Sequence, residues 1–143
     1  LELLWVSGMR ISELSNLNFG DLNLEQNEIT VFGKGAKERI VLISEHCKVF
    51  LQRYIKKARP LIAKGYNLEP ITDTTPLFIN NTGYRLQNKT IRNVINDVVN
   101  KLYMPKHVTP HMFRHSFATM LLEPTQSTKR QQKTYHDSKH NTK

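Results

Sequence analysis

Apolar residues recur at helical spacing in several stretches of the chain and alternate with polar residues in one. Residues 2–17 predict a helix that is interrupted at Gly8, because glycine readily adopts the backbone conformations that end a helix. Residues 21–43 change to the alternating pattern of β-strands, with a turn at residues 26–27 and a second, basic turn at residues 33–37. This segment predicts a small antiparallel sheet of three strands.

Two further helices are predicted after the sheet. Residues 45–58 fit a helix with Ser44 as its N-cap and Pro60 near its end. Its expected buried face consists of Cys47, Phe50, Leu51, Tyr54, Ile55 and Ala58. Residues 65–89 are mostly loop, and residues 89–102 form the next predicted helix. Its expected buried face consists of Ile91, Val94, Ile95, Val98, Val99 and Leu102.

The last part of the chain divides into a helix and a polar tail. Thr109 and Pro110 suit the start of a helix that runs through Leu122. Residues 124–143 contain one large apolar side chain among many basic ones, too little to offset the entropy of ordering, so they predict a disordered basic tail. We therefore expect an α+β fold, mostly helical, in a partial domain over residues 1–123, and we expect the chain to be a fragment because it opens within an apolar run.

Composition adds a preference for polyanions. The 143 residues include 21 Lys and Arg against 12 Asp and Glu, a formal charge of +9, which favours a partner such as DNA or RNA. The single cysteine, Cys47, cannot form an internal disulfide and fits a reducing compartment and a core position. No apolar run approaches the roughly 20 residues that span a bilayer, so a cytoplasmic protein is expected.

Four basic side chains stand out by their context: Arg10, Lys34, His111 and Arg114. Two guanidinium groups can hold the non-bridging oxygens of a phosphodiester while its negative charge grows, and arginine stays protonated as they do so. A lysine can protonate a departing sugar oxygen, and an imidazole can move a proton at the attacking group. Taken singly, each residue also fits an ordinary surface charge, and spacing alone does not bring the four together.

Three motifs around these residues carry a family resemblance. The segment GMRISEL at residues 8–14 resembles the first arginine signature of the tyrosine recombinases, also called the phage integrase family. The segment GKGAKER at residues 33–39 resembles their β-hairpin signature, and TPHMFRHSFAT at residues 109–119 resembles their H-x-x-R box. The order and the spacing of the three also match, and the resemblance covers roughly residues 1–123. It is strongest toward Xer-like recombinases and the integrases of phages and conjugative elements.

The resemblance implies a fold, a reaction and a role for each residue. Arg10 and Arg114 would bind the scissile phosphate, Lys34 would act as the general acid, and His111 would be the catalytic histidine. The implied fold is that of the tyrosine recombinase catalytic domain, and the implied partners are double-stranded DNA and further recombinase protomers bound to it. No metal, cofactor or small-molecule substrate is implied.

Two other residues of the hairpin signature and one of the first signature have expected supporting roles. Lys37 and Arg39 are expected to contact the DNA backbone, which carries no base sequence information. Glu13 is expected to support the region around Arg10.

The resemblance stops near Glu123. The family continues with an L-G-H box and a T-x-x-Y-x-H motif that carries the nucleophilic tyrosine, and neither is present. Tyr135 is the one tyrosine after Arg114, but it lies in the polar tail, where no apolar helix would hold it in place. The favoured hypothesis is a recombinase fragment without its nucleophile. The alternatives are a catalytically dead DNA-binding remnant and a basic nucleic-acid-binding structural protein.

Overall fold

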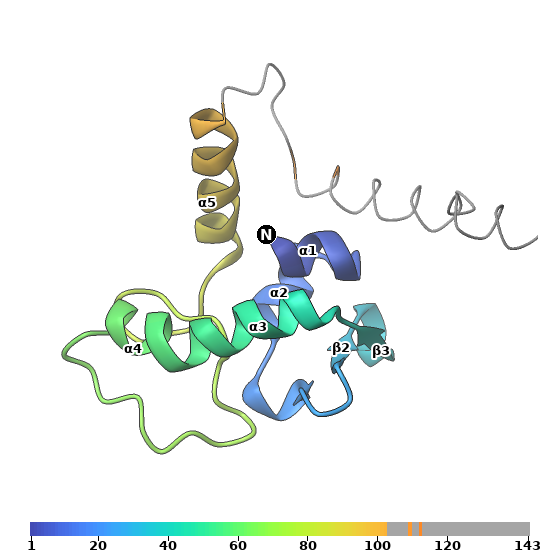
Figure 1. Cartoon of the computed structure of the whole chain (residues 1–143), viewed down its shortest axis with the longest axis horizontal. Coiled ribbons are helices and arrows are strands. Elements are labelled where there is room, and N and C mark those ends of the chain that lie inside the picture. Colours follow the sequence, from blue (N-terminus) through green and yellow to red (C-terminus); the bar gives the residue numbers. More distant parts are fainter. Residues whose placement is uncertain (103–108, 110–111, 113–143) are drawn as a thin grey trace, which may run out of the picture.

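The computed structural model describes residues 1–102, 109 and 112. Two short helices open the chain and a small sheet follows them (Figure 1). The main elements are α1 (Glu2–Ser7), α2 (Ile11–Asn16), β1 (Leu22–Asn23), β2 (Glu28–Phe32), β3 (Glu38–Leu42), α3 (Glu45–Arg53), α4 (Arg59–Ile62) and α5 (Asn88–Lys101). Single helical turns η1 (Phe19–Asp21), η2 (Lys34–Ala36) and η3 (Tyr54–Ala58) lie between them. This is the predicted α+β architecture, mostly helical with a three-stranded antiparallel sheet.

The predicted interruption at Gly8 is confirmed. Gly8 follows α1 in the left-handed conformation, with φ 59° and ψ 18°, which costs glycine less than any residue with a Cβ. Its N–H donates to Leu4 O at 3.2 Å and closes the last turn of α1. The chain then turns, and α2 begins after its N-cap residue, Arg10.

The three predicted strands are also confirmed, in the order β1-β2-β3 and antiparallel throughout. Ile29 and Val31 of β2 are fully buried against the helices. Val31 is paired with Arg39 of β3, and side chains directly opposite in a ladder project from the same face of the sheet. Arg39 therefore lies on the inner, core-facing side of the sheet, next to the turn that carries Lys34.

The helix after the sheet starts as predicted but ends later. Ser44 accepts a hydrogen bond from Cys47 N at 3.1 Å and caps α3. The helical path passes the predicted approximate end at Pro60 by two residues, because it continues through η3, a π-helical turn, and through α4 to Ile62. Pro60 lies in the first turn of α4. It directly follows the π-type bond from Arg59 N to Tyr54 O, so regular α-helical bonding is already interrupted where the proline lacks its N–H.

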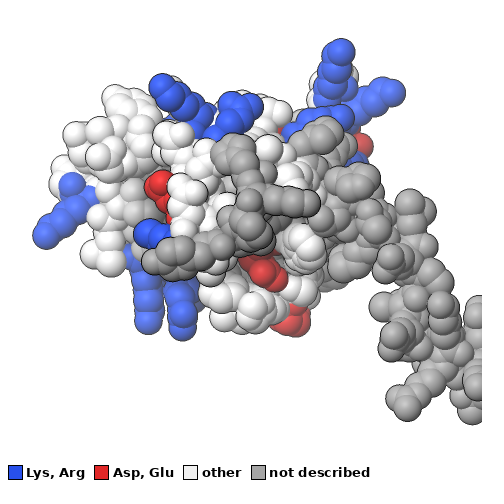
Figure 2. Space-filling model, turned by 90° about the horizontal axis from the view of Figure 1, so that it is seen from above, with Lys and Arg blue, Asp and Glu red and all other residues white. Residues whose placement is uncertain are grey.

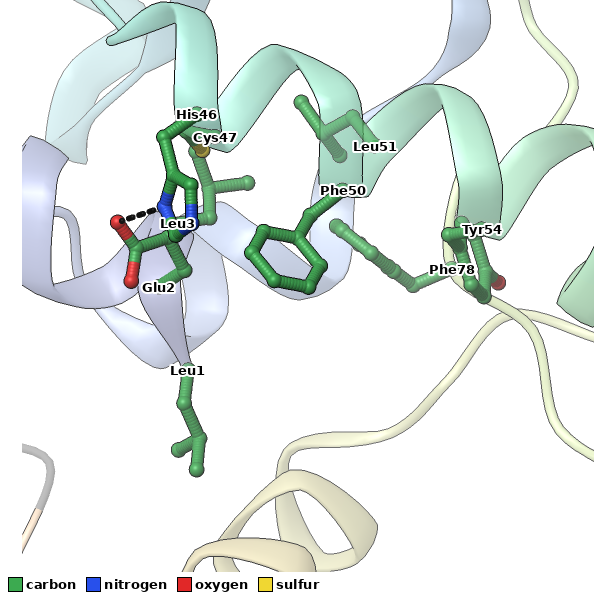
Figure 3. Close-up of a pocket in the computed structure, with 9 residues that line it drawn as sticks. All are labelled: Leu1, Glu2, Leu3, His46, Cys47, Phe50, Leu51, Tyr54 and Phe78. Atoms are coloured by element: carbon green, nitrogen blue, oxygen red, sulfur yellow. Dashed lines mark hydrogen bonds and ion pairs between the residues drawn. The ribbon is translucent and has the colours of Figure 1, made fainter.

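Three residues of the predicted buried faces are exposed. Phe50 of α3 is 48% exposed, Val94 of α5 is 49% exposed, and Leu102 just beyond α5 is 64% exposed. Phe50 and Val94 line two adjoining apolar hollows between α1, α3, α5 and the Phe78 side chain, and Figure 3 shows Phe50 on the wall of the first. Helical spacing identifies the apolar side of a helix, but it does not tell whether another segment covers each position.

The long loop before α5 is fastened to the core by two arginines. Arg59 is 3% exposed; it donates to Leu77 O at 3.3 Å and to Pro76 O at 3.0 Å, and its guanidinium lies 5.0 Å from the centre of the Phe19 ring. Arg85 donates to Ser15 O at 2.9 Å, at the end of α2. These bonds fix the C-terminal end of the helix whose N-terminus carries Arg10.

The predicted helix from Thr109 to Leu122 and the predicted tail over residues 124–143 lie outside the described residues, apart from Thr109 and Met112. Met112 N donates to Thr109 O at 3.0 Å. Among the helices of the described part of the chain, none has both the length and the apolar character that crossing a bilayer requires.

Candidate phosphate-binding site

Arg10 is positioned by the turn that joins α1 to α2. Its backbone N–H donates to Glu13 Oε2 at 2.7 Å, and its Nη1 donates to Glu13 Oε1 at 3.1 Å. Its side chain remains 52% exposed. Arg10 is thus held at its base and on one edge, while the rest of its guanidinium faces solvent and can bind an anion.

Glu13 is the centre of the cluster. It lies in the first turn of α2 and is 5% exposed. Arg39 of β3 donates a hydrogen bond to each carboxylate oxygen, from Nη1 to Oε1 at 3.0 Å and from Nη2 to Oε2 at 2.8 Å. A forked pair of this kind is the strongest geometry that arginine and a carboxylate form. The expected supporting role of Glu13 toward Arg10 is confirmed by these contacts.

The charges in this cluster shift the pKa of Glu13. Burial of the carboxyl raises its pKa, but the hydrogen bonds from Arg39 and from the Arg10 backbone, together with the charge of Arg39, outweigh burial and lower it to about 2. The same ion pair raises the pKa of Arg39. Glu13 is therefore ionised at neutral pH, and the three side chains carry a combined charge of +1.

Lys34 lies close to this cluster, at the tip of the hairpin between β2 and β3. The turn is closed by Gly33 N, which donates to Lys37 O at 2.8 Å. Gly33 packs against the ion pair: a Cβ at this position would lie 3.5 Å from Glu13 Oε1 and 3.7 Å from Arg39 Nη1. Lys34 and Lys37 are exposed. The hairpin thus presents two lysines to solvent beside the cluster that holds Arg10.

Of the six candidate residues from the sequence, four lie in the described part of the chain: Arg10, Lys34, Lys37 and Arg39. Arg10 and Arg39 both bind Glu13, and Lys34 and Lys37 belong to the hairpin turn whose Gly33 adjoins that ion pair. His111 and Arg114 lie outside the described residues. Figure 2 shows Lys and Arg side chains spread over several parts of one face of the molecule, so surface charge alone does not single out this site.

The bond between Arg39 and Glu13, which are 26 residues apart, was not among the contacts expected from the sequence. The strand pattern did indicate the direction of Arg39, because Arg39 and Val41 are two residues apart in β3 and therefore face the same side of the strand. Val41 is 9% exposed. A charged residue on the buried face of a strand requires a partner, and Glu13 is that partner.

A larger, apolar hollow in the described part of the chain lies away from this cluster. A hollow of about 470 Å³ between α1, α3 and Phe78 is lined mostly by apolar side chains (Figure 3). His46 and Glu2 at its edge are 3.5 Å apart. The described residues contain no group of three His, Cys, Asp or Glu side chains that could hold a metal ion. The exposed cationic cluster is the arrangement suited to a phosphate, and the hollow is not.

Comparison with known proteins places the chain in a family. Residues 1–142 match the model of the phage integrase family, and the chain belongs to that family. It is 42% identical over 123 residues to tyrosine recombinase XerD of Oceanobacillus iheyensis, covering 86% of this chain and 40% of the relative. It is 41% identical over 123 residues to tyrosine recombinase XerC of Thermodesulfovibrio yellowstonii, again covering 40% of the relative. The resemblance drawn from the three motifs is thereby confirmed.

Solved structures give the same result for the fold. The chain resembles the XerA recombinase with a TM-score of 0.70 and 34% identity, over 85% of this chain and 41% of that one. It resembles the Tn1549 transposon integrase, solved in complex with transposon right end DNA, with a TM-score of 0.63 and 28% identity over 85% of this chain and 44% of that one. The predicted fold of a tyrosine recombinase catalytic domain is confirmed. The chain spans about two fifths of the length of the curated relatives it matches.

Proposed function

We propose that this chain supplies the phosphate-binding part of a site-specific tyrosine recombinase that acts on double-stranded DNA. Arg10, Lys34, His111 and Arg114 would surround one backbone phosphate, and Lys37 would contact the DNA backbone beside it. The observation that carries the proposal is the cluster around Glu13, which holds a half-exposed arginine beside a hairpin that carries two exposed lysines. Recombinases and a transposon integrase bound to DNA are among the structures that this fold resembles.

The chemistry proposed for the whole enzyme is a transesterification, in which one phosphodiester bond is exchanged for another. A tyrosine oxygen attacks the phosphorus and forms a 3′-phosphotyrosyl bond, while the bond to the 5′ oxygen breaks. Lys34 gives its proton to that 5′ oxygen, and His111 assists transfer of the proton of the attacking tyrosine hydroxyl. Arg10 and Arg114 stabilise the charge on the non-bridging oxygens through fixed hydrogen bonds.

Binding of a short DNA duplex tests the role of Arg10. Arg10→Ala should weaken binding about tenfold, since a hydrogen bond to a charged group contributes roughly 1.5–3 kcal/mol and a tenfold change corresponds to about 1.4 kcal/mol. Arg92→Ala, which removes an exposed arginine from α5, is the matched control. Equal effects of the two variants would instead favour a basic structural protein that binds nucleic acid through its general surface charge.

A catalytically dead DNA-binding remnant is the second candidate function. It is favoured by the sequence after Glu123, which lacks the family's tyrosine motif. A nicked suicide duplex traps any covalent intermediate, and we expect this chain to give none. An adduct that survives denaturation would overturn the remnant hypothesis, and its loss in Tyr135→Phe would identify Tyr135 as the nucleophile.

A further inference from the structure

We propose that Arg39 is a positioning residue of the phosphate site, which acts through Glu13 to keep Arg10 available to phosphate and to hold the Lys34 hairpin beside it. This inference rests on the proposed function. It differs from the role expected from the sequence, in which Arg39 contacts the DNA backbone directly.

The geometry of Arg39 sets it apart from an ordinary surface arginine. Its strand register places it opposite the fully buried Val31, on the core side of the sheet. Both of its terminal nitrogens are bound to the carboxylate of Glu13, whose side chain is 4% exposed. Because Arg39 grips both oxygens, it fixes the plane of the carboxylate as well as its position.

This fixed carboxylate limits how Arg10 can bind it. Oε1 receives one N–H from Arg10 and one from Arg39, and Oε2 receives the Arg10 backbone N–H and the second N–H of Arg39. Arg10 therefore reaches Glu13 with one side-chain bond and leaves its other donors free. With Arg39 removed, the side chains of Arg10 and Glu13 would carry no net charge, and Arg10 could turn to form the forked pair itself.

The same ion pair fastens the hairpin. A Cβ added at Gly33, the residue before Lys34, would lie in van der Waals range of Glu13 Oε1 and Arg39 Nη1, so the turn adjoins the ion pair. Arg39 itself follows the turn, at the start of β3. The α2 helix that begins after Arg10 and the hairpin that carries Lys34 are thus joined through one carboxylate. Loss of Arg39 would release the hairpin from Glu13, while Arg10 would keep its own bonds to that carboxylate.

Side-chain NMR of nitrogen-15-labelled arginine tests this link without DNA. In Arg39→Gln the signals of the Arg10 guanidinium should shift, and Glu13→Gln, which keeps the shape of the side chain, should shift them too. Lys37→Gln, a change at an exposed hairpin residue, should leave them in place. Backbone spectra report whether each variant is folded. An Arg10 spectrum that is the same in Arg39→Gln and in the unaltered chain would overturn the proposal.

A double-mutant cycle on duplex DNA tests the consequence for binding. Arg39→Gln should weaken binding about tenfold in the unaltered chain and by a clearly smaller factor in Arg10→Ala, because the part of its effect that passes through Arg10 is already lost there and only the part that passes through the Lys34 hairpin remains. Lys37→Gln should give the same fold-change in both backgrounds. Additive effects of Arg39 and Arg10 would overturn the proposal. If Arg10 responds by NMR but Arg10→Ala binds DNA no worse than Arg92→Ala, the proposed function fails while the link between the two arginines stands.

Discussion

Glu13 should make the stability of this chain depend on pH in the acid range. Its carboxyl has a pKa of about 2 in the folded chain, against an ordinary value of 4.5. A carboxyl whose pKa is lower in the folded chain than in the unfolded chain stabilises the fold at pH values above the unfolded-state pKa. This stabilisation is lost as the pH falls toward the folded-state pKa. The difference between the two pKa values corresponds to about 3 kcal/mol at neutral pH, of which about 2 kcal/mol should be lost by pH 3.

Urea denaturation followed by circular dichroism at several pH values between 7 and 3 measures this effect. Glu13→Gln should be less stable than the unaltered chain by about 3 kcal/mol at pH 7, and the gap should narrow steadily below about pH 4.5. Glu25→Gln removes a carboxylate from an exposed turn and serves as the control for charge. A stability difference between Glu13→Gln and the unaltered chain that stays constant from pH 7 to pH 3 would show that the Glu13 carboxyl does not have a lowered pKa in the folded chain.

Three other changes test the packing that supports the site. Arg59→Met should destabilise the fold by roughly 1–3 kcal/mol in urea titrations, since it removes the Arg59 donor to Pro76 O and leaves the buried Leu77 O with only the Tyr54 hydroxyl as its side-chain donor; an effect below about 0.5 kcal/mol would contradict this. Burial raises the pKa of Cys47 to about 11. The thiol should therefore resist iodoacetamide at pH 8 until urea unfolds the chain. Prompt labelling of the native chain would count against a buried thiol. Ser44→Ala removes the N-cap of α3 and should cost about 1 kcal/mol by thermal melting, whereas an unchanged melting temperature would show that the cap is dispensable.

The arrangement of helices and strands was largely predictable, because local chemistry sets it. Gly8 ends α1 and Ser44 caps α3 as their residue types indicate. The π-helical turn before Pro60 was not predictable, since helical spacing does not reveal a local change in hydrogen-bond register. The exposure of Phe50 and Val94 also escaped prediction, because burial depends on which segments pack against a helix and not on its own spacing.

The candidate site was predictable only through motifs. Arg10 and Lys34 are ordinary basic residues by composition, and the family resemblance alone selected them. The contact between Arg39 and Glu13 depends on how the sheet packs against α2, which no local pattern encodes. The inward direction of Arg39 could nevertheless have been read from its alternation with Val41 in β3. The motifs therefore supplied the candidate residues, and the structure shows what holds Arg10 and Arg39 in place.

An experimentally determined structure of this chain bound to duplex DNA would test the proposed phosphate site most directly. We expect one backbone phosphate within hydrogen-bonding distance of the guanidinium groups of both Arg10 and Arg114, with the Lys34 ammonium beside its sugar oxygen and Arg39 still bound to Glu13. A complex in which Arg10 and Arg114 contact separate phosphates, or in which Arg10 contacts none, would contradict this proposal.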